Sequence, residues 1–406
     1  MPHPSSEPAT TKHASLNSDA ITPPTLNPRP HMALDEPCWC LSNKPWGECH
    51  KEREQATRPS LGAVIHDVER IKVPCACAHP DAPRGCDKIA QAHTIQRRGG
   101  LTELAENGHV GHISLVDGQT SEKVVGIRSA STFMGFCRAH DAAMFAPIET
   151  VSPNLDTESL FLFSFRALAY AHFMTTNALM NVTILRELDA GLPLEAQALY
   201  QQHCIIPKMI GTERTMKELS ALKGRYDAAY RTPSYADFHS CAWVFSDVLP
   251  VAYAGVFRPE ADIHGAPLQR LTHGHDRNEI LSACMTPLHG KTLFTLGWFG
   301  RSDGPSGRFA DAFGSLSDAQ KANAAMHLGF EELANVFYQL AWWRRLPADA
   351  HDILKAKRLA GTETGPDKQP GSLANASPVL STATVLNARW SMPPSPLPGN
   401  AVNPAT

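Results

Sequence analysis

The sequence predicts an α+β protein in which two small cysteine- and histidine-rich modules precede a larger domain. Three observations lead to this prediction: two Cys/His clusters, a long apolar helical pattern, and three later segments that alternate as strands do. A chain of 406 residues has room for two or three such parts.

Composition narrows the class of protein. Hydrophobic residues make up 43% of the chain, as in ordinary soluble proteins. The net charge of −3 gives no bulk reason for non-specific binding to DNA or membranes. Because no apolar run could span a bilayer and the N-terminus lacks the apolar core of a secretory signal, we expect a cytoplasmic location. There the ten cysteines would be reduced, so clustered ones indicate metal ligands.

Residues 1–33 are rich in Pro, Ser, Thr and His without periodicity, which predicts a disordered tail. The first cluster follows, in residues 34–58. It consists of a C-x-C pair and an adjacent Cys-His pair: Cys38, Cys40, Cys49 and His50. Four such ligands suit one tetrahedral zinc ion and leave no position open for a substrate. Since so short a segment cannot bury a core, the metal would supply its folding energy.

This segment resembles the SEC-C motif, which occurs at the C-terminus of the preprotein translocase ATPase and in many other bacterial proteins. Ser42, Lys44 and Trp46 are also in register with the motif, and Asn43 replaces its glycine. Asn is the next most tolerant residue of a left-handed turn. The resemblance implies zinc, a bacterial source, and a small interaction surface that in relatives meets protein or ribosomal partners.

The second cluster lies in residues 61–150. A Pro/Gly-rich loop separates its first two cysteines, and a C-x-x-H pair follows at the start of a predicted helix. A knuckle pair combined with a pair at a helix start is typical of a treble clef. The predicted ligands of a second zinc ion are Cys77, Cys86, Cys137 and His140. Cys75 is an alternative to Cys77, and spacing does not decide between them.

Between these two pairs, the order of Ala92-His93 and Asn107-Gly108-His109 resembles the HNH, or His-Me finger, nucleases. The resemblance implies that His93 is a general base and that Asn107 holds its ring by a hydrogen bond. His109 or Asp141 would then help to bind one Mg²⁺ or similar ion. The usual histidine doublet of that family is absent. The alternative interpretation is that His93 and His109 are hydrogen-bonded core residues, or replace one of the zinc ligands.

From residue 156 to 346 the pattern predicts a mostly helical domain with a small antiparallel sheet. A long apolar helix ends at Gly191, and residues 194–231 continue as helix. Strands are predicted in residues 249–259, 278–288 and 291–300, and a long helix in 317–346. Residues 350–406, rich in Pro, Ala and Ser, predict a second disordered tail.

The loop at 258–276 gathers carboxylates and imidazoles, which makes a hydrolase site a third possibility. Its candidate residues are Glu260, Asp262, His264, His273, His275 and Asp276. The His pair of a zinc hydrolase helix is missing, so a polar hairpin loop is the simpler interpretation. No phosphate-binding or dinucleotide motif occurs, and we expect no nucleotide cofactor.

The sequence therefore predicts a zinc-binding bacterial cytoplasmic protein with two structural zinc ions. It would act by binding a macromolecule, either protein or nucleic acid, and would not bind membranes. The alternative function is a metal-dependent, HNH-like nuclease that uses His93 and Mg²⁺.

Overall fold

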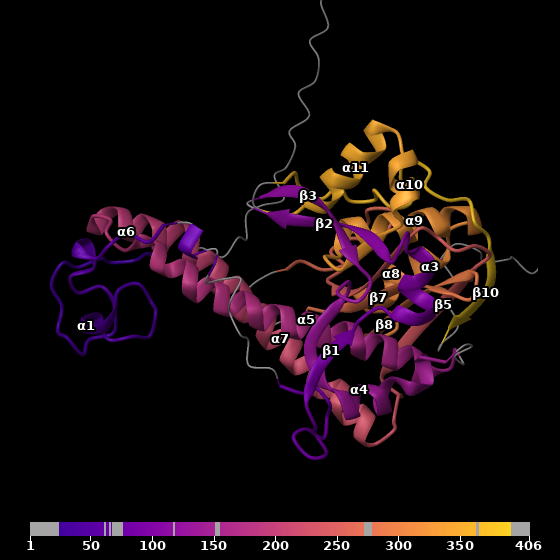
Figure 1. Ribbon diagram of the computed structural model, residues 1–406, viewed down its shortest axis with the longest axis horizontal. Coiled ribbons are helices and arrows are strands. Elements are labelled where there is room, and N and C mark those ends of the chain that lie inside the picture. The colour runs from indigo at the N-terminus through magenta and orange to yellow at the C-terminus, as the bar shows by residue number, and fades with distance from the viewer. Residues whose placement is uncertain are drawn as a thin grey trace, which may run out of the picture.

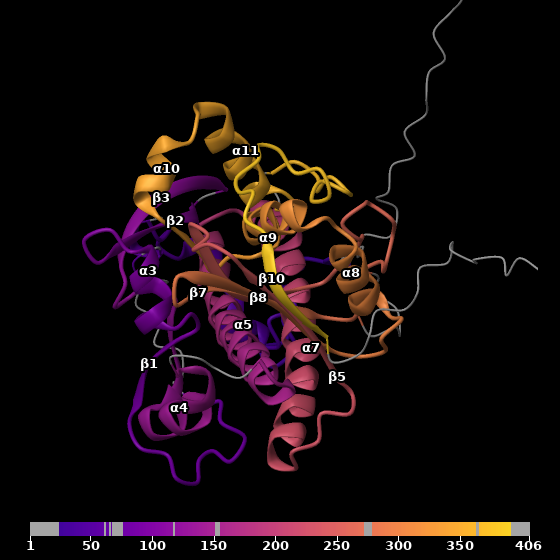
Figure 2. The same cartoon turned by 90° about the vertical axis from the view of Figure 1, so that its right-hand side faces the viewer.

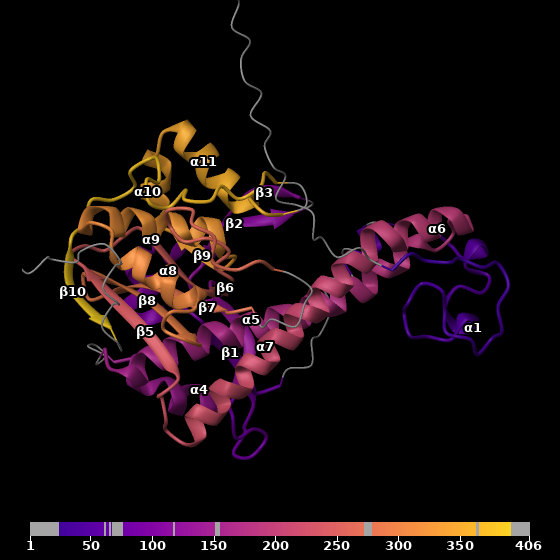
Figure 3. The same ribbon diagram turned by 180° about the vertical axis from the view of Figure 1, so that it is seen from behind.

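The computed structural model describes residues 24–60, 62–64, 66, 76–116, 118–150, 155–271, 278–362 and 365–390. They form a body built on one large sheet and a helical arm that projects from it (Figure 1). The first cysteine cluster, around the short helix α1 (Trp46–Cys49), lies at the far end of this arm, as the view from behind also shows (Figure 3).

The large sheet has eight strands, and every pairing in it is antiparallel. Its strands in spatial order are β10 (Val385–Trp390), β5 (Phe238–Phe245), β8 (Lys291–Phe299), β7 (Leu281–Leu288), β6 (Val251–Phe257), β9 (Val336–Tyr338), β2 (His109–Val116) and β3 (Gln119–Gly126). The sequence predicted β6, β7 and β8, and these are confirmed. The predicted small sheet is therefore only the centre of a larger one.

Helices cover both faces of this sheet (Figure 2). Large side chains such as Trp243 and Tyr253 face α8 (Pro305–Gly314) and α9 (Asp318–Glu332). The other face carries small residues, including Ala242, Ala252 and Ala254, and packs against the Phe-rich helix α5 (Thr157–Leu185). Small residues on one face let the bulky helix approach closely, because packed interiors leave few voids.

The arm consists of the outer half of α5 together with the first part of α7 (Ile206–Arg231), whose second part packs in the body (Figure 1). Asp156 caps α5 by accepting a hydrogen bond from the backbone N–H of Ser159. At the tip, the chain runs through η4 (Arg186–Asp189), α6 (Leu194–Tyr200) and the π-helical turn η5 (Gln201–Ile205). The helix α5 ends at Leu185, earlier than the predicted stop at Gly191, and η4 continues to Asp189 before Gly191 turns the chain with φ +74°.

The central module is divided between two sheets. Strand β1 (Ile89–His93) pairs with β4 (Thr132–Cys137), and α4 (Arg138–Phe145) follows directly. The hairpin of β2 and β3 lies between β1 and β4 in sequence but joins the large sheet through β9. The turns η2 (Arg97–Leu101), α3 (Thr102–Leu104) and η3 (Ala146–Ile148) complete this region. The described strands of residues 61–150 therefore take part in both sheets.

Three predicted segments differ in the structure. Residues 24–33 belong to the predicted tail, yet Leu26 is buried and its N–H donates to Gln202 on the arm. The predicted helix over 317–346 is divided into α9, strand β9 and α10 (Leu340–Arg345). The second predicted tail begins as α11 (Ala348–Leu359) and includes β10, the last strand of the sheet. Residues 1–23 and 391–406 lie outside the described residues.

Candidate metal centres

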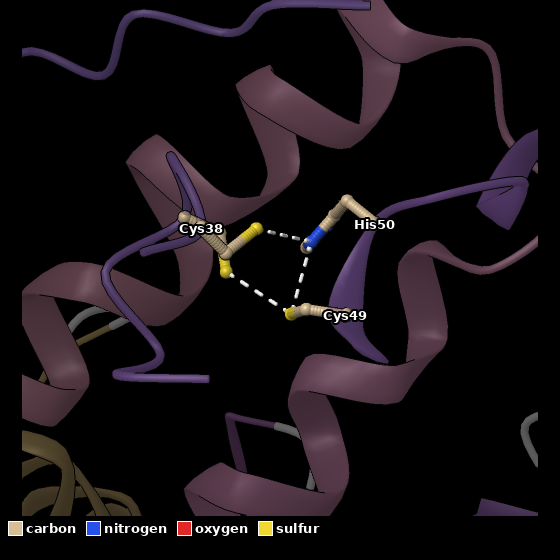
Figure 4. Close-up of side chains that lie close together, drawn as sticks. Cys38, Cys49 and His50 are labelled. Carbon is tan, nitrogen blue, oxygen red and sulfur yellow. Dashed lines mark hydrogen bonds between the residues drawn. The ribbon is translucent and has the colours of Figure 1, made fainter. Parts of the chain in front are cut away.

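The first centre brings together the four predicted ligands Cys38, Cys40, Cys49 and His50, whose ligand atoms all lie within 4.8 Å of one another. The Nδ1 atom of His50 is 3.2 Å from the Sγ atoms of both Cys38 and Cys49. Figure 4 shows these three side chains pointing toward a common centre. The Sγ atoms of Cys40 and Cys49 are 3.5 Å apart. This cluster could hold one metal ion with four protein ligands.

A tight loop presents these ligands. The N–H of Cys38 donates to the carbonyl of Lys44, which closes the loop, and α1 then carries Cys49 inward. Leu41 and Asn43 both have φ +60°, in the left-handed region. Asn tolerates that conformation better than most residues, which suits Asn43 to this turn.

A buried carboxylate stands directly behind the ligand His50. The Nε2 atom of His50 lies 3.1 Å from Oδ2 of Asp189, which is fully buried and comes from the end of η4 on the arm. Gln201 donates to the same oxygen at 2.6 Å, and Arg53 donates to Oδ1 at 2.6 Å. Burial alone would raise the pKa of Asp189, but these hydrogen bonds and the charge of Arg53 outweigh burial and lower it.

Two further contacts join Cys40 to the arm. Arg186 donates to the carbonyl of Cys40 at 2.8 Å and lies 3.3 Å from its Sγ. Hydrogen bonds from the thiols of Cys38 and Cys49 lower the pKa of Cys40 and so favour its thiolate form. Because a bound thiolate cluster is anionic, the buried guanidinium of Arg186 offsets part of its charge.

The second centre brings together Cys77, Cys86, Cys137 and His140, again with all ligand atoms within 4.8 Å. The Nδ1 atom of His140 lies 3.3–3.5 Å from the three sulfurs. Cys137 caps α4, since its side chain accepts from the N–H of His140. Cys77 belongs to this cluster, and its alternative Cys75 lies outside the described residues. This cluster could also hold a metal ion.

The two centres differ in their surroundings. His140 is stacked on His79, with ring centroids 3.9 Å apart, and no carboxylate bonds to its ring within the described parts of the chain. His79 in turn lies 3.4 Å from the hydroxyl of Tyr230, near the C-terminal end of α7. At the other end of α7, Ile206 packs with Cys38 and Cys40 of the first centre. The surroundings of the two centres therefore include opposite ends of this helix, which at 26 residues is roughly 39 Å long.

The predicted catalytic residues do not form the expected contacts. The ring of His93 bonds to the carbonyl of Ile127 at 3.2 Å and not to Asn107, and burial lowers its pKa. Asn107 and Gly108, with φ +50° and +75°, form a tight turn closed by two hydrogen bonds between Glu106 and His109. Asn-Gly is the preferred pair for such a turn, so turn geometry accounts for Asn107. The Nδ1 atom of His109 bonds to the carbonyl of Asn107.

Asp141 stands apart from that turn, on α4. Its Oδ1 atom is buried, has no hydrogen-bond partner among the described residues, and lies 3.9 Å from the guanidinium of Arg166. Arg166 is itself buried, bonds to Glu149 at 2.6 Å and lies over the ring of Phe145. Arg166 on α5 therefore forms an ion pair with Asp141 on α4. The guanidinium of Arg166 is thus a cation already present beside Asp141.

The loop at 258–276 holds no metal cluster among its described residues. Asp262 instead closes a turn by accepting from the N–H groups of His264 and Ala266. The remaining candidates, His273, His275 and Asp276, lie outside the described residues.

No protein-family model, no curated protein and no solved structure matches this chain. Among the helices of the described residues, none combines the length and the apolar character needed to cross a membrane.

Proposed function

We propose that this chain is a zinc-binding protein that acts by binding a macromolecule. The partner meets the SEC-C-like segment at the tip of the arm, residues 34–58, which is called the knuckle below. Zinc is the best candidate for both centres because each gathers three cysteines and one histidine within 4.8 Å of one another, and thiolates with an imidazole are preferred ligands of structural zinc. Four protein ligands leave no position for a substrate, which favours a structural role over a catalytic one.

The placement of the knuckle is the observation that carries the binding proposal. The knuckle lies at the tip of the arm, away from the body (Figure 3). Large apolar side chains are exposed there: Leu34 and Leu41 on the knuckle are 58% and 40% exposed, and Leu199 on α6 is 61% exposed. Exposed apolar residues on a rigid projecting element are a common feature of contact surfaces.

Zinc content tests the first half of the proposal. Protein purified without added metal should contain two zinc ions per chain, and Cys49→Ala and Cys137→Ala should each lose one of them. Measurement by atomic emission, with protein quantified by amino-acid analysis, checks this result. One zinc ion in the native chain, or a metal other than zinc, would contradict it.

A charge placed on the knuckle tests the second half. The double variant Leu34→Glu, Leu41→Glu should weaken binding to a macromolecular partner at least tenfold, since both side chains are exposed and the metal ligands are untouched. The probes are purified bacterial ribosomes, transfer RNA and a DNA duplex. Leu386→Glu, an equally apolar exposed residue on β10 at the other edge of the body, is the matched control. Equal binding by both variants would overturn the role of the knuckle.

The HNH-like nuclease has less support. In its favour, β1, β4 and α4 form a strand–strand–helix unit around the second centre, with His93 on β1 and Asp141 on α4. Against it, Arg166 already occupies the cation position beside Asp141, and the ring of His93 bonds to a backbone carbonyl. Magnesium-dependent cleavage of plasmid DNA that disappears in His93→Ala would reverse this preference.

A further inference from the structure

A cavity of about 230 Å³ lies where the arm leaves the body. The inner part of α5 contributes Tyr170 and Met174, and α7 contributes Leu219. The end of β6 and the segment after α9 complete the wall, with Phe257 and Leu333 among their residues. Most of the lining is apolar, so water inside gains few hydrogen-bond partners. Neither metal centre contributes a ligand to this lining.

One cationic side chain belongs to the lining. Arg258 follows β6, and its Nη2 atom lies 3.4 Å from the hydroxyl of Thr215, which also lines the cavity. Glu218 fixes the guanidinium by accepting from Nε at 2.9 Å and from Nη2 at 2.6 Å. Within the described residues, Nη1 of Arg258 makes no hydrogen bond. A rigid donor is therefore left for a ligand.

Glu218 holds a second arginine beside this guanidinium. Glu218 also accepts from Arg214 at 3.1 Å and from Asn278 at 3.0 Å. Burial acts to raise the pKa of Glu218, but the charge and hydrogen bonds of Arg258 and Arg214 outweigh it, so Glu218 stays ionised and holds both guanidiniums in place.

We propose that this cavity binds a small carboxylic acid with an apolar body, whose carboxylate pairs with Arg258. An apolar cavity of about 150 Å³ accommodates benzene, so this larger one has room for a short acyl chain or a single substituted ring. Guanidinium–carboxylate hydrogen bonds are among the stronger polar contacts in proteins and provide the selectivity for an acid. The proposal is independent of zinc and of the macromolecular partner.

Calorimetric titration of the full chain with hexanoate and with hexanamide tests the proposal. The two probes have the same apolar body and differ in charge. Hexanoate should bind saturably and at least tenfold more tightly than hexanamide, because only the acid pairs with Arg258. Equal affinities, or no binding of hexanoate at concentrations up to about 10 mM, a limit that corresponds to a very weak complex, would overturn the proposal.

Methyl signals of isotope-labelled methionine locate the ligand. Met174 lines the cavity and is 44% exposed, so its methyl signal, assigned with Met174→Leu, should shift on addition of hexanoate. A shift confined to other methionines would place the ligand elsewhere and overturn the proposal. This measurement uses the native side chains of the wall and needs no destabilising substitution.

Two variants separate the contributions of charge and space. Arg258→Gln should reduce the preference for hexanoate over hexanamide to about twofold or less while hexanamide still binds. Thr175→Phe should abolish binding of both probes by filling the cavity, since the hydroxyl of Thr175 bonds only to the carbonyl of Ala171 on its own helix. Unchanged selectivity in folded Arg258→Gln, shown by its unfolding midpoint and metal content, would refute the assignment of the carboxylate partner.

Discussion

Replacing Asp189 by asparagine is expected to weaken metal binding at the first centre by about 10- to 100-fold. The carboxylate accepts from His50 and Gln201 on one oxygen and from Arg53 on the other. An amide of the same shape offers only one acceptor atom, so at least one of these donors would face an NH₂ group. The affinity for the metal ion falls because the hydrogen bond to Asp189 keeps the proton of His50 on Nε2 and leaves Nδ1 free to ligate.

Competition with a chromophoric chelator measures this effect, and the second centre serves as an internal reference. Glu187→Gln is the matched control: Glu187 also bonds to Arg53, but it is half-exposed and does not contact His50. Its variant should retain the affinity of the native chain. If both centres weaken equally in Asp189→Asn, or if the first centre is unchanged, the role of Asp189 as an orienting residue is wrong.

The ligands of both clusters could be predicted from the sequence, whereas the residues that support them could not. Cys38 and His50 are only 12 residues apart, so their spacing alone indicates a shared ion. Asp189 lies 139 residues beyond His50 and is a single acid near the end of a helical pattern. No local signal distinguishes it from a surface residue, because its role depends on the knuckle folding back onto the arm.

The size of the sheet was underestimated for similar reasons. Strand β5 is buried on both faces and shows no alternation, and β9 has only three residues beside a helical pattern. Strands β3 and β10 are the edge strands of the sheet, and β3 is polar. The long-range pairing of β2 with β9 cannot be inferred from periodicity. The Asn107-Gly108 pair, in contrast, is a local sequence signal for a tight turn, and this signal explains Asn107 without a catalytic role.

The stability of the body should fall by about 3 kcal/mol more in the native chain than in His327→Gln as the pH is lowered from 6.5 to 4. His327 on α9 is fully buried, and its Nε2 donates to the carbonyl of Pro378. Burial lowers its pKa to about 4, whereas an unfolded histidine titrates near 6.5. Between pH 6.5 and pH 4 the unfolded state binds more protons at this residue than the folded state does, so lowering the pH favours unfolding. Above this range the ring is neutral in both states, and its titration no longer affects stability.

Chemical denaturation at pH 7, 6, 5 and 4, followed by tryptophan fluorescence, measures the difference between the two proteins. Any effect of acid on the two Cys/His clusters is common to both proteins and cancels in that difference. Glutamine keeps a donor that can reach Pro378 but cannot titrate, so its variant isolates the ionisation of the ring. Parallel curves for the two proteins would show that His327 is protonated in the folded state at pH 5, and the neutral ring inferred from its burial would then be incorrect.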